Sequence, residues 1–144
     1  MKKISVLFVC LGNICRSPAA EAIFISLLER KGLSDSFIVD SAGTGSWHIG
    51  KKADSRMRIA AERREINILS RARQITSKDF DKFNYILAMD NSNFRNIKDL
   101  KNRTASTDFA SIKKIQDFRS VLMSKRFLTH ILEAMRALIM SLIF

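Results

Sequence analysis

The sequence predicts an α/β fold, a parallel sheet with helices on both faces, formed by one domain. Short apolar runs rich in β-branched and aromatic residues alternate along the chain with segments of helical periodicity. The spacers between the apolar runs are long enough for right-handed crossover helices. The chain has 144 residues, 47% of them hydrophobic, which suits one core and excludes wholesale disorder. Because no internal repeat or linker interrupts the alternation, residues 1–144 are expected to form a single domain.

Three runs predict buried strands, over residues 5–9, 37–40 and 85–89. The first is apolar without alternation, as a strand covered on both faces should be. It also resembles the core of a signal peptide, because Lys2 and Lys3 precede it. The apolar run spans only about eight residues before Asn13 and Arg16 interrupt it, which is short for a signal peptide. A buried strand in a cytoplasmic protein is therefore the expectation.

Three segments predict helices after these strands. Pro18 suits a first helical turn, and apolar residues repeat at helical spacing from there until Gly32 ends the pattern. Asp54 is a candidate N-cap for a helix that reaches about residue 65. Asn91 or Ser92 is expected to begin the next helix.

The formal net charge of +11 suggests nucleic-acid or membrane binding, but its distribution does not support either. Residues 1–111 hold 19 basic and 12 acidic side chains, and residues 112–144 hold 6 basic and 2 acidic ones. No basic block is interleaved with aromatic residues, so nucleic-acid binding is disfavoured. No apolar run approaches the roughly 18 residues of a spanning helix. Two cysteines exclude a disulfide scaffold and leave metal, redox or catalytic roles.

The segment after the first strand carries the chemistry. Its sequence, CLGNICRSP over residues 10–18, lies where parallel sheets bind ligands, beyond a strand's carboxyl end and at a helix N-terminus. Gly12 and Asn13 tolerate the dihedral angles that turn backbone N–H groups inward around an oxyanion. The helix dipole favours the thiolate form of Cys10. Arg16 offers a planar fork that matches two phosphate oxygens, and Ser17 can donate a hydrogen bond to the thiolate.

Residues 9–18 resemble the phosphate-binding loop of the low-molecular-weight protein tyrosine phosphatases. Residues 40–44 (DSAGT), 72–76 (ARQIT) and 88–93 (AMDNSN) match further blocks of that family, so the resemblance covers about residues 4–100. It implies a three-layer αβα fold with a central four-stranded parallel sheet. It also implies hydrolysis of phosphotyrosine in proteins, or of small aryl phosphates, without metal or cofactor.

The resemblance also implies roles for single residues. Cys10 would attack phosphorus and form a cysteinyl-phosphate that water then hydrolyses, while the loop and Arg16 hold the transferring group. The loop includes Gly12 and Cys15, and Cys15 would be either a redox partner of Cys10 or a bystander thiol. A network that fixes the loop would contain Asn13, Ser17 and Ser41. An aromatic slot would be lined by Leu11, Ile14 and Trp47.

Several alternatives stay open. For Trp47 the alternative is a loop anchor, and for Arg73 and Asp90 loop support competes with ordinary capping or ion pairing. His48 and His130 lie in no motif that suggests a ligand or a base. Arsenate reductases of similar fold need further resolving cysteines, and phosphoarginine phosphatases of the family carry threonine where Ile14 stands, so Ile14 favours phosphotyrosine. A non-catalytic binder of phosphotyrosine or another oxyanion is a second candidate function.

The end of the chain departs from the family pattern. The family's general acid lies in an Asp-Pro-Tyr loop, and the only proline of this chain is Pro18. Asp108 and Asp117 lack that context, so reduced activity is expected. Back-translation of residues 126–143 in another reading frame permits an Asp-Pro loop and an acidic ending, which suggests a frameshift upstream of Arg126. An amphipathic helix over residues 125–144 that binds a membrane or a partner is a further alternative. The oligomeric state is not predicted.

Overall fold

The computed structural model describes residues 2–105, 108–115, 137 and 140. These residues contain a four-stranded sheet in the order β2-β1-β3-β4, with all three pairings parallel. The strands are β1 (Ile4–Cys10), β2 (Phe37–Gly43), β3 (Tyr85–Ala88) and β4 (Ser111–Lys114). The helices are α1 (Arg16–Arg30), α2 (Ser55–Glu62), α3 (Asp79–Lys82) and α4 (Asn91–Asn102), with a 3₁₀ turn, η1 (Ser34–Ser36), before β2. The predicted α/β class and four-stranded parallel sheet are confirmed.

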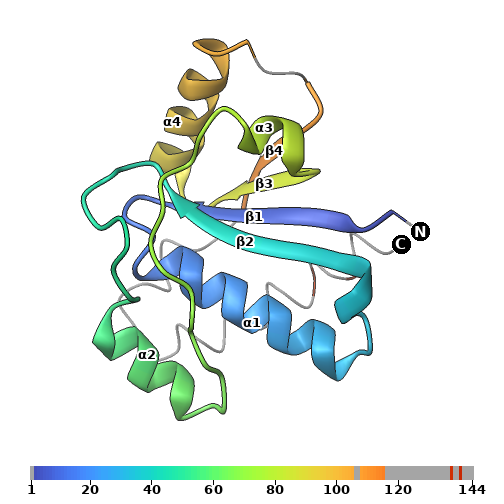
Figure 1. Ribbon diagram of the computed structural model, residues 1–144, viewed down its shortest axis with the longest axis vertical. Coiled ribbons are helices and arrows are strands. Elements are labelled where there is room, and N and C mark those ends of the chain that lie inside the picture. The colour runs from blue at the N-terminus through green and yellow to red at the C-terminus, as the bar shows by residue number, and fades with distance from the viewer. Residues whose placement is uncertain (1, 106–107, 116–136, 138–139, 141–144) are drawn as a thin grey trace.

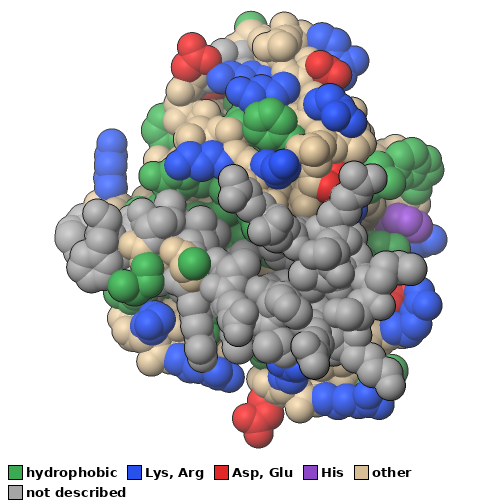
Figure 2. Space-filling view, turned by 180° about the vertical axis from the view of Figure 1, so that it is seen from behind, with side chains coloured by type: hydrophobic (Ala, Val, Ile, Leu, Met, Phe, Trp, Pro, Cys, Tyr) green, Lys and Arg blue, Asp and Glu red, His purple; other side chains and the backbone are tan. Residues whose placement is uncertain are grey.

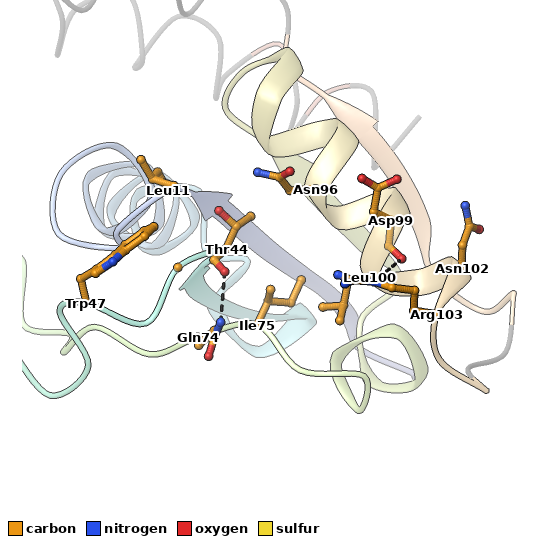
Figure 3. Close-up of a pocket in the computed structure, with 11 residues that line it drawn as sticks. Leu11, Thr44, Trp47, Gln74, Ile75, Asn96, Asp99, Leu100, Asn102 and Arg103 are labelled. Carbon is orange, nitrogen blue, oxygen red and sulfur yellow. Dashed lines mark hydrogen bonds between the residues drawn. The ribbon is translucent and has the colours of Figure 1, made fainter.

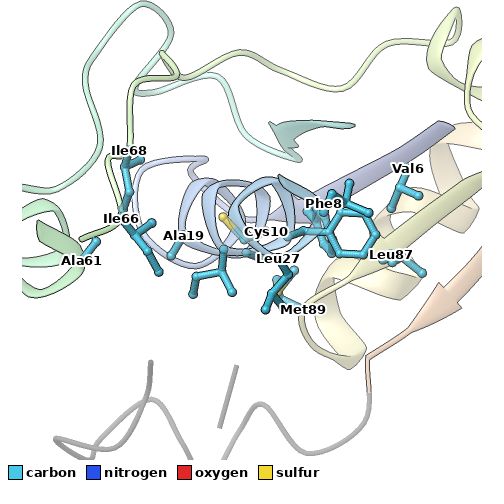
Figure 4. Packing of buried hydrophobic residues seen from close by; sticks show 14 of the residues in the cluster. Val6, Phe8, Cys10, Ala19, Leu27, Ala61, Ile66, Ile68, Leu87 and Met89 are labelled. Carbon is cyan, nitrogen blue, oxygen red and sulfur yellow. The ribbon is translucent and has the colours of Figure 1, made fainter. Parts of the chain in front are cut away.

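Helices cover both faces of the sheet (Figure 1). On the α1 face, Phe24 makes edge-to-face contacts with Phe8 and with Phe37, each with ring centroids 5.6 Å apart. Figure 4 shows buried residues of this cluster, in which Cys10 lies between Ala19 and Phe8. On the opposite face Phe80, Phe83 and Ile97 pack against the sheet. The six consecutive buried residues at the end of β1 follow from this double cover, because side chains on both sides of the strand face apolar layers.

Several element boundaries differ from the sequence expectation. β2 continues through Gly43, beyond the predicted strand over residues 37–40, because residues 41–43 pair with the end of β1. α1 begins at Arg16, two residues before the predicted proline start. α2 ends at Glu62 rather than near residue 65, and Glu65 has a left-handed φ of 61°, which no helix interior adopts. α3 and β4 were not identified from the sequence pattern, because α3 is a single helical turn and β4 (SIKK) lacks the apolar run that marks the equally short β3 (YILA).

Several predictions concern residues outside the described part of the chain. These are the general-acid candidate Asp117, the role of His130, the frameshift upstream of Arg126 and the amphipathic helix over residues 125–144. Among the described residues, no helix is long and apolar enough to cross a membrane.

Candidate active site

The loop between β1 and α1 lies at the carboxyl end of an inner strand of the sheet. Asn13 adopts a left-handed φ of 55°, a conformation that asparagine tolerates better than most residues. Gly43, at the end of β2, forms the wall behind the loop: a Cβ atom there would lie 2.8 Å from the Leu11 carbonyl oxygen and 3.1 Å from the Asn13 nitrogen. The loop and β2 are therefore in backbone contact, which only glycine permits.

Cys10 ends β1 with its sulfur directed at the loop. The side chain is buried, with 3% of its surface exposed. The Asn13 backbone N–H donates to Cys10 Sγ at 3.2 Å, and Ser17 Oγ lies 3.0 Å from the same sulfur. α1 begins directly after the loop, and no side chain caps its N-terminus at Cys15. The first N–H groups of a helix have no carbonyl partner within the helix, so those of α1 are directed at the loop. This arrangement places hydrogen-bond donors and the positive end of the α1 dipole beside the sulfur, where a bound anion would be stabilised.

Asn13 connects the loop to two neighbouring segments. Its Nδ2 donates to Ser17 Oγ at 2.8 Å and to Ser41 Oγ at 2.9 Å, and its Oδ1 accepts the Arg73 backbone N–H at 3.0 Å. Ser41 in turn donates to Glu21 Oε2 at 3.2 Å. The structure thus brings together the residues of the predicted loop-fixing network, Asn13, Ser17 and Ser41.

Arg16, the first residue of α1, forms an ion pair with Asp90. Arg16 Nη1 lies 2.7 Å from Asp90 Oδ2. The other carboxylate oxygen accepts the Asn93 N–H at 2.7 Å, so Asp90 is also the N-cap of α4. Burial alone would raise the pKa of Asp90, but the Asn93 hydrogen bond and the Arg16 charge outweigh it, and the pKa falls below its usual value. Capping and support of the loop arginine are therefore combined in one carboxylate.

Arg73 performs a similar double task on the other side of the loop. Its backbone holds Asn13, while its guanidinium lies 3.0 Å from Asp40 Oδ2 and 3.1 Å from Asp79 Oδ2. Burial lowers the pKa of Arg73, but the two carboxylates outweigh burial and the pKa is raised. The two ion pairs attach the segment around Arg73 to β2 and to α3, and this segment supports the loop through its hydrogen bond to Asn13.

A cavity of about 500 Å³ borders the loop, with Leu11 and Trp47 at one end and residues of α4, including Asn96 and Asp99, at the other (Figure 3). Cys10 and Arg16 are not among its lining residues, so the cavity lies beside Cys10 rather than over it. Of the three residues predicted to line an aromatic slot, Leu11 and Trp47 line this cavity and Ile14 does not. Ile14 instead accepts the Asp54 backbone N–H through its carbonyl, at 2.6 Å.

The chain matches the family described as "Low molecular weight phosphotyrosine protein phosphatase" over residues 5–131. The chain belongs to this family. A fission yeast member, from Schizosaccharomyces pombe, is 50% identical over 101 residues, which make up 69% of this chain and 65% of that protein. The pig member, from Sus scrofa, is 48% identical over 93 residues, 65% of this chain and 59% of that protein. The aligned region thus spans less than two thirds of the length of these curated relatives.

Solved structures of the family match over almost the whole chain. A protein tyrosine phosphatase from Entamoeba histolytica, with Hepes in its active site, has a TM-score of 0.83 at 36% identity and covers 97% of both chains. A Drosophila arginine phosphatase has the same TM-score at 31% identity, covering 98% of this chain and 97% of the other. The same fold therefore occurs in a protein named a tyrosine phosphatase and in one named an arginine phosphatase.

Cys15 is the second cysteine of the family loop and is half-buried. Cys10 and Cys15 are both free in this structure. Burial raises the pKa of the Cys15 thiol, and the nearby Asp54 carboxylate and Cys10 raise it further. Cys15 is therefore disfavoured as the thiolate partner in this state of the site.

Two residues beside the family loop, His48 and Glu21, were not predicted from the sequence. The His48 ring packs against Gly12, since a Cβ there would lie 2.9 Å from His48 Cδ2. Glu21 lies within the apolar repeat of α1 yet faces Ser41, with 7% of its surface exposed. Burial, followed by the charge of Asp40, raises the pKa of Glu21 to about 7. A carboxylate on the apolar face of a predicted helix was the signal that could have identified it.

The candidate general acid Asp108 is exposed and paired. Its carboxylate lies 2.7 Å from Lys101 Nζ, and that hydrogen bond and charge lower the pKa of Asp108. A lowered pKa makes a carboxyl group a poorer proton donor near neutral pH. Within the described ranges, no group of three or more acidic, histidine or cysteine side chains is arranged to hold a metal ion.

Proposed function

We propose that this protein hydrolyses phosphotyrosine in proteins, and small aryl phosphates, through a cysteinyl-phosphate intermediate on Cys10. The observation that carries the proposal is the placement of Cys10 Sγ 3.2 Å from the Asn13 N–H and 3.0 Å from Ser17 Oγ, at the N-terminus of α1. Membership of the family supports it.

The reaction would proceed as two displacements at phosphorus. The Cys10 thiolate attacks, the S–P bond forms, and the bond from phosphorus to the phenolic oxygen breaks. Water then attacks the cysteinyl-phosphate and releases inorganic phosphate and the Cys10 thiolate. The loop N–H groups and Arg16 would hold the charge on the transferring group, which is the larger part of such catalysis. Ser17 would stabilise Cys10 as the leaving group of the second step.

The leaving phenolate needs a proton, and Asp108 is poorly suited to supply it. Loss of a general acid costs about 10²–10⁴-fold in rate. We therefore expect turnover of p-nitrophenyl phosphate, whose leaving group is good, to exceed turnover of a phosphotyrosyl peptide. Robust turnover of the peptide that is abolished by Asp108→Asn would contradict this assignment.

The decisive experiment compares the protein with its Cys10→Ser variant on p-nitrophenyl phosphate. We expect release of p-nitrophenol by the protein and none above background by the variant. Binding of a phosphotyrosyl peptide without phosphate release would instead favour the non-catalytic binder. A phosphoarginine peptide is the matched substrate control, because one structural neighbour is named an arginine phosphatase. Ile14 favours phosphotyrosine, and faster turnover of the phosphoarginine peptide would overturn that choice.

We also propose a cytoplasmic location for this protein. The N-terminal apolar run forms the inner strand β1 of the sheet, as expected of a folded domain rather than of a cleaved leader.

A further inference from the structure

Glu21 is a buried carboxylate that the proposed reaction does not use directly. It lies on the face of α1 that packs on the sheet, and its Oε2 accepts the Ser41 hydroxyl proton at 3.2 Å. The charged groups that face it are Asp40 of β2 and Arg73 of the segment before α3, and Ser70 also hydrogen-bonds to it. A carboxylate buried to this degree costs free energy unless its hydrogen bonds compensate.

The hydrogen bonds between Glu21 and Cys10 have a defined direction. The Asn13 carbonyl accepts the Arg73 N–H, so the Asn13 amide nitrogen faces Ser41 and Ser17 and donates one proton to each. Ser41 then has its own proton free for Glu21. Ser17 has its own proton for Cys10 Sγ at 3.0 Å or for the Ala42 carbonyl at the longer distance of 3.4 Å.

We propose that Glu21 is a positioning residue for Cys10: its carboxylate accepts the Ser41 proton and so holds Ser41 Oγ as an acceptor for Asn13, whose other amide proton goes to Ser17 beside the sulfur. This inference rests on the proposed function, because it takes Cys10 as the nucleophile. Glu21 touches neither the sulfur nor a substrate in this arrangement, and it acts through the three side chains that lie between it and Cys10.

Protonation of Glu21 changes the pattern. A carboxyl O–H can donate to Ser41, and the Ser41 proton then loses Glu21 as its acceptor. Burial and the Asp40 charge favour the protonated form, while Ser41, Arg73 and Ser70 oppose it, which leaves the pKa of Glu21 at about 7. The hydrogen bond that orients the Ser41 hydroxyl, and with it the acceptor for Asn13, is therefore sensitive to pH near neutrality.

The test measures alkylation of Cys10 by iodoacetamide in the full chain between pH 5.5 and 8.5, with the modified cysteine assigned by mass spectrometry. Glu21→Gln keeps an acceptor for Ser41 but cannot ionise. We expect the ratio of the wild-type rate to the Glu21→Gln rate to rise about threefold across this range, centred near pH 7. The ratio removes the ionisation of Cys10 itself, which both proteins share. Glu29→Gln, on an exposed position of α1, is the matched control and should give a flat ratio.

A second variant, Glu21→Met, removes the acceptor at similar side-chain length. We expect its kcat on p-nitrophenyl phosphate at pH 8 to fall about 3- to 10-fold relative to Glu21→Gln, with KM changed less than twofold. A flat wild-type to Glu21→Gln ratio, or a Glu21→Met kcat equal to that of Glu21→Gln, would overturn the proposal. If no protein hydrolyses p-nitrophenyl phosphate but the ratio of alkylation rates still rises with pH, the proposed function is rejected and the role of Glu21 in positioning Cys10 is retained.

Discussion

At the scale of single residues, the Ser17 hydroxyl lies beside the proposed nucleophile, Cys10. Its oxygen lies 3.0 Å from Cys10 Sγ and accepts from Asn13 Nδ2 at 2.8 Å. A hydrogen bond to a charged group contributes about 1.5–3 kcal/mol, so Ser17→Ala should lower kcat on p-nitrophenyl phosphate about 10- to 100-fold. Steady-state kinetics would measure this. Ser26→Ala on the same helix is the control, and an equal loss in both variants would show a general effect on α1.

Glu21 gives a prediction for stability as well as for reactivity. The folded protein holds a proton on Glu21 up to about pH 7, whereas an unfolded chain releases it near 4.5. The folded state therefore binds more protons between these values, and the stability that this supplies at low pH is lost as the pH rises through the window. Urea unfolding should show the wild type losing about 1–3 kcal/mol relative to Glu21→Gln between pH 5 and pH 8. A pH-independent difference between the two proteins would contradict the raised pKa.

At the scale of elements, α2 and α4 offer a matched pair of aspartate caps. Asp54 accepts the Met57 N–H at 3.3 Å, and Asp90 accepts the Asn93 N–H at 2.7 Å while also holding Arg16. Asp54→Ala and Asp90→Ala should each cost about 1 kcal/mol of unfolding free energy through loss of a cap. Only Asp90→Ala should also lower kcat/KM for an aryl phosphate, about 3- to 10-fold, because only it releases the loop arginine. Equal kinetic losses would show that the Arg16 pair does not orient the guanidinium.

Much of this element structure could be predicted from the sequence. The apolar run of β1 and the caps Asp54 and Asp90 depend on local patterns, which composition and spacing reveal. The continuation of β2 through Gly43 depends on pairing with the end of β1, which no local pattern records. β4 (SIKK) has no apolar run like that of β3, and α3 is a single turn, too short for helical periodicity to identify it. The same limit applies to Glu21 and His48, whose neighbours in the site, Ser41 and Gly12, lie 20 and 36 positions away in the sequence.

At the scale of the whole molecule, the formal net charge of +11 sets a positive field. Lys and Arg side chains occupy several separate areas of the face shown in Figure 2. Such a field raises the rate at which a dianion reaches the site, and salt screens it over about 10 Å at 0.1 M. Raising NaCl from 0.02 to 0.2 M should lower kcat/KM for p-nitrophenyl phosphate about 3- to 10-fold with little change in kcat. Alkylation of Cys10 by neutral iodoacetamide is the control and should not respond to salt.

The hydrogen bonds of Asn13 have a consequence for following the folding of this chain. They join the loop to Ser41 and to the Arg73 backbone, which lie 28 and 60 positions along the sequence. The reactive environment of Cys10 therefore forms only after distant segments of the chain have come together, so thiol reactivity reports on native tertiary structure. Trp47, the single tryptophan, is already 67% exposed in the folded state. In a refolding experiment, the rate of Cys10 alkylation will consequently be a more specific probe of native tertiary structure than tryptophan fluorescence.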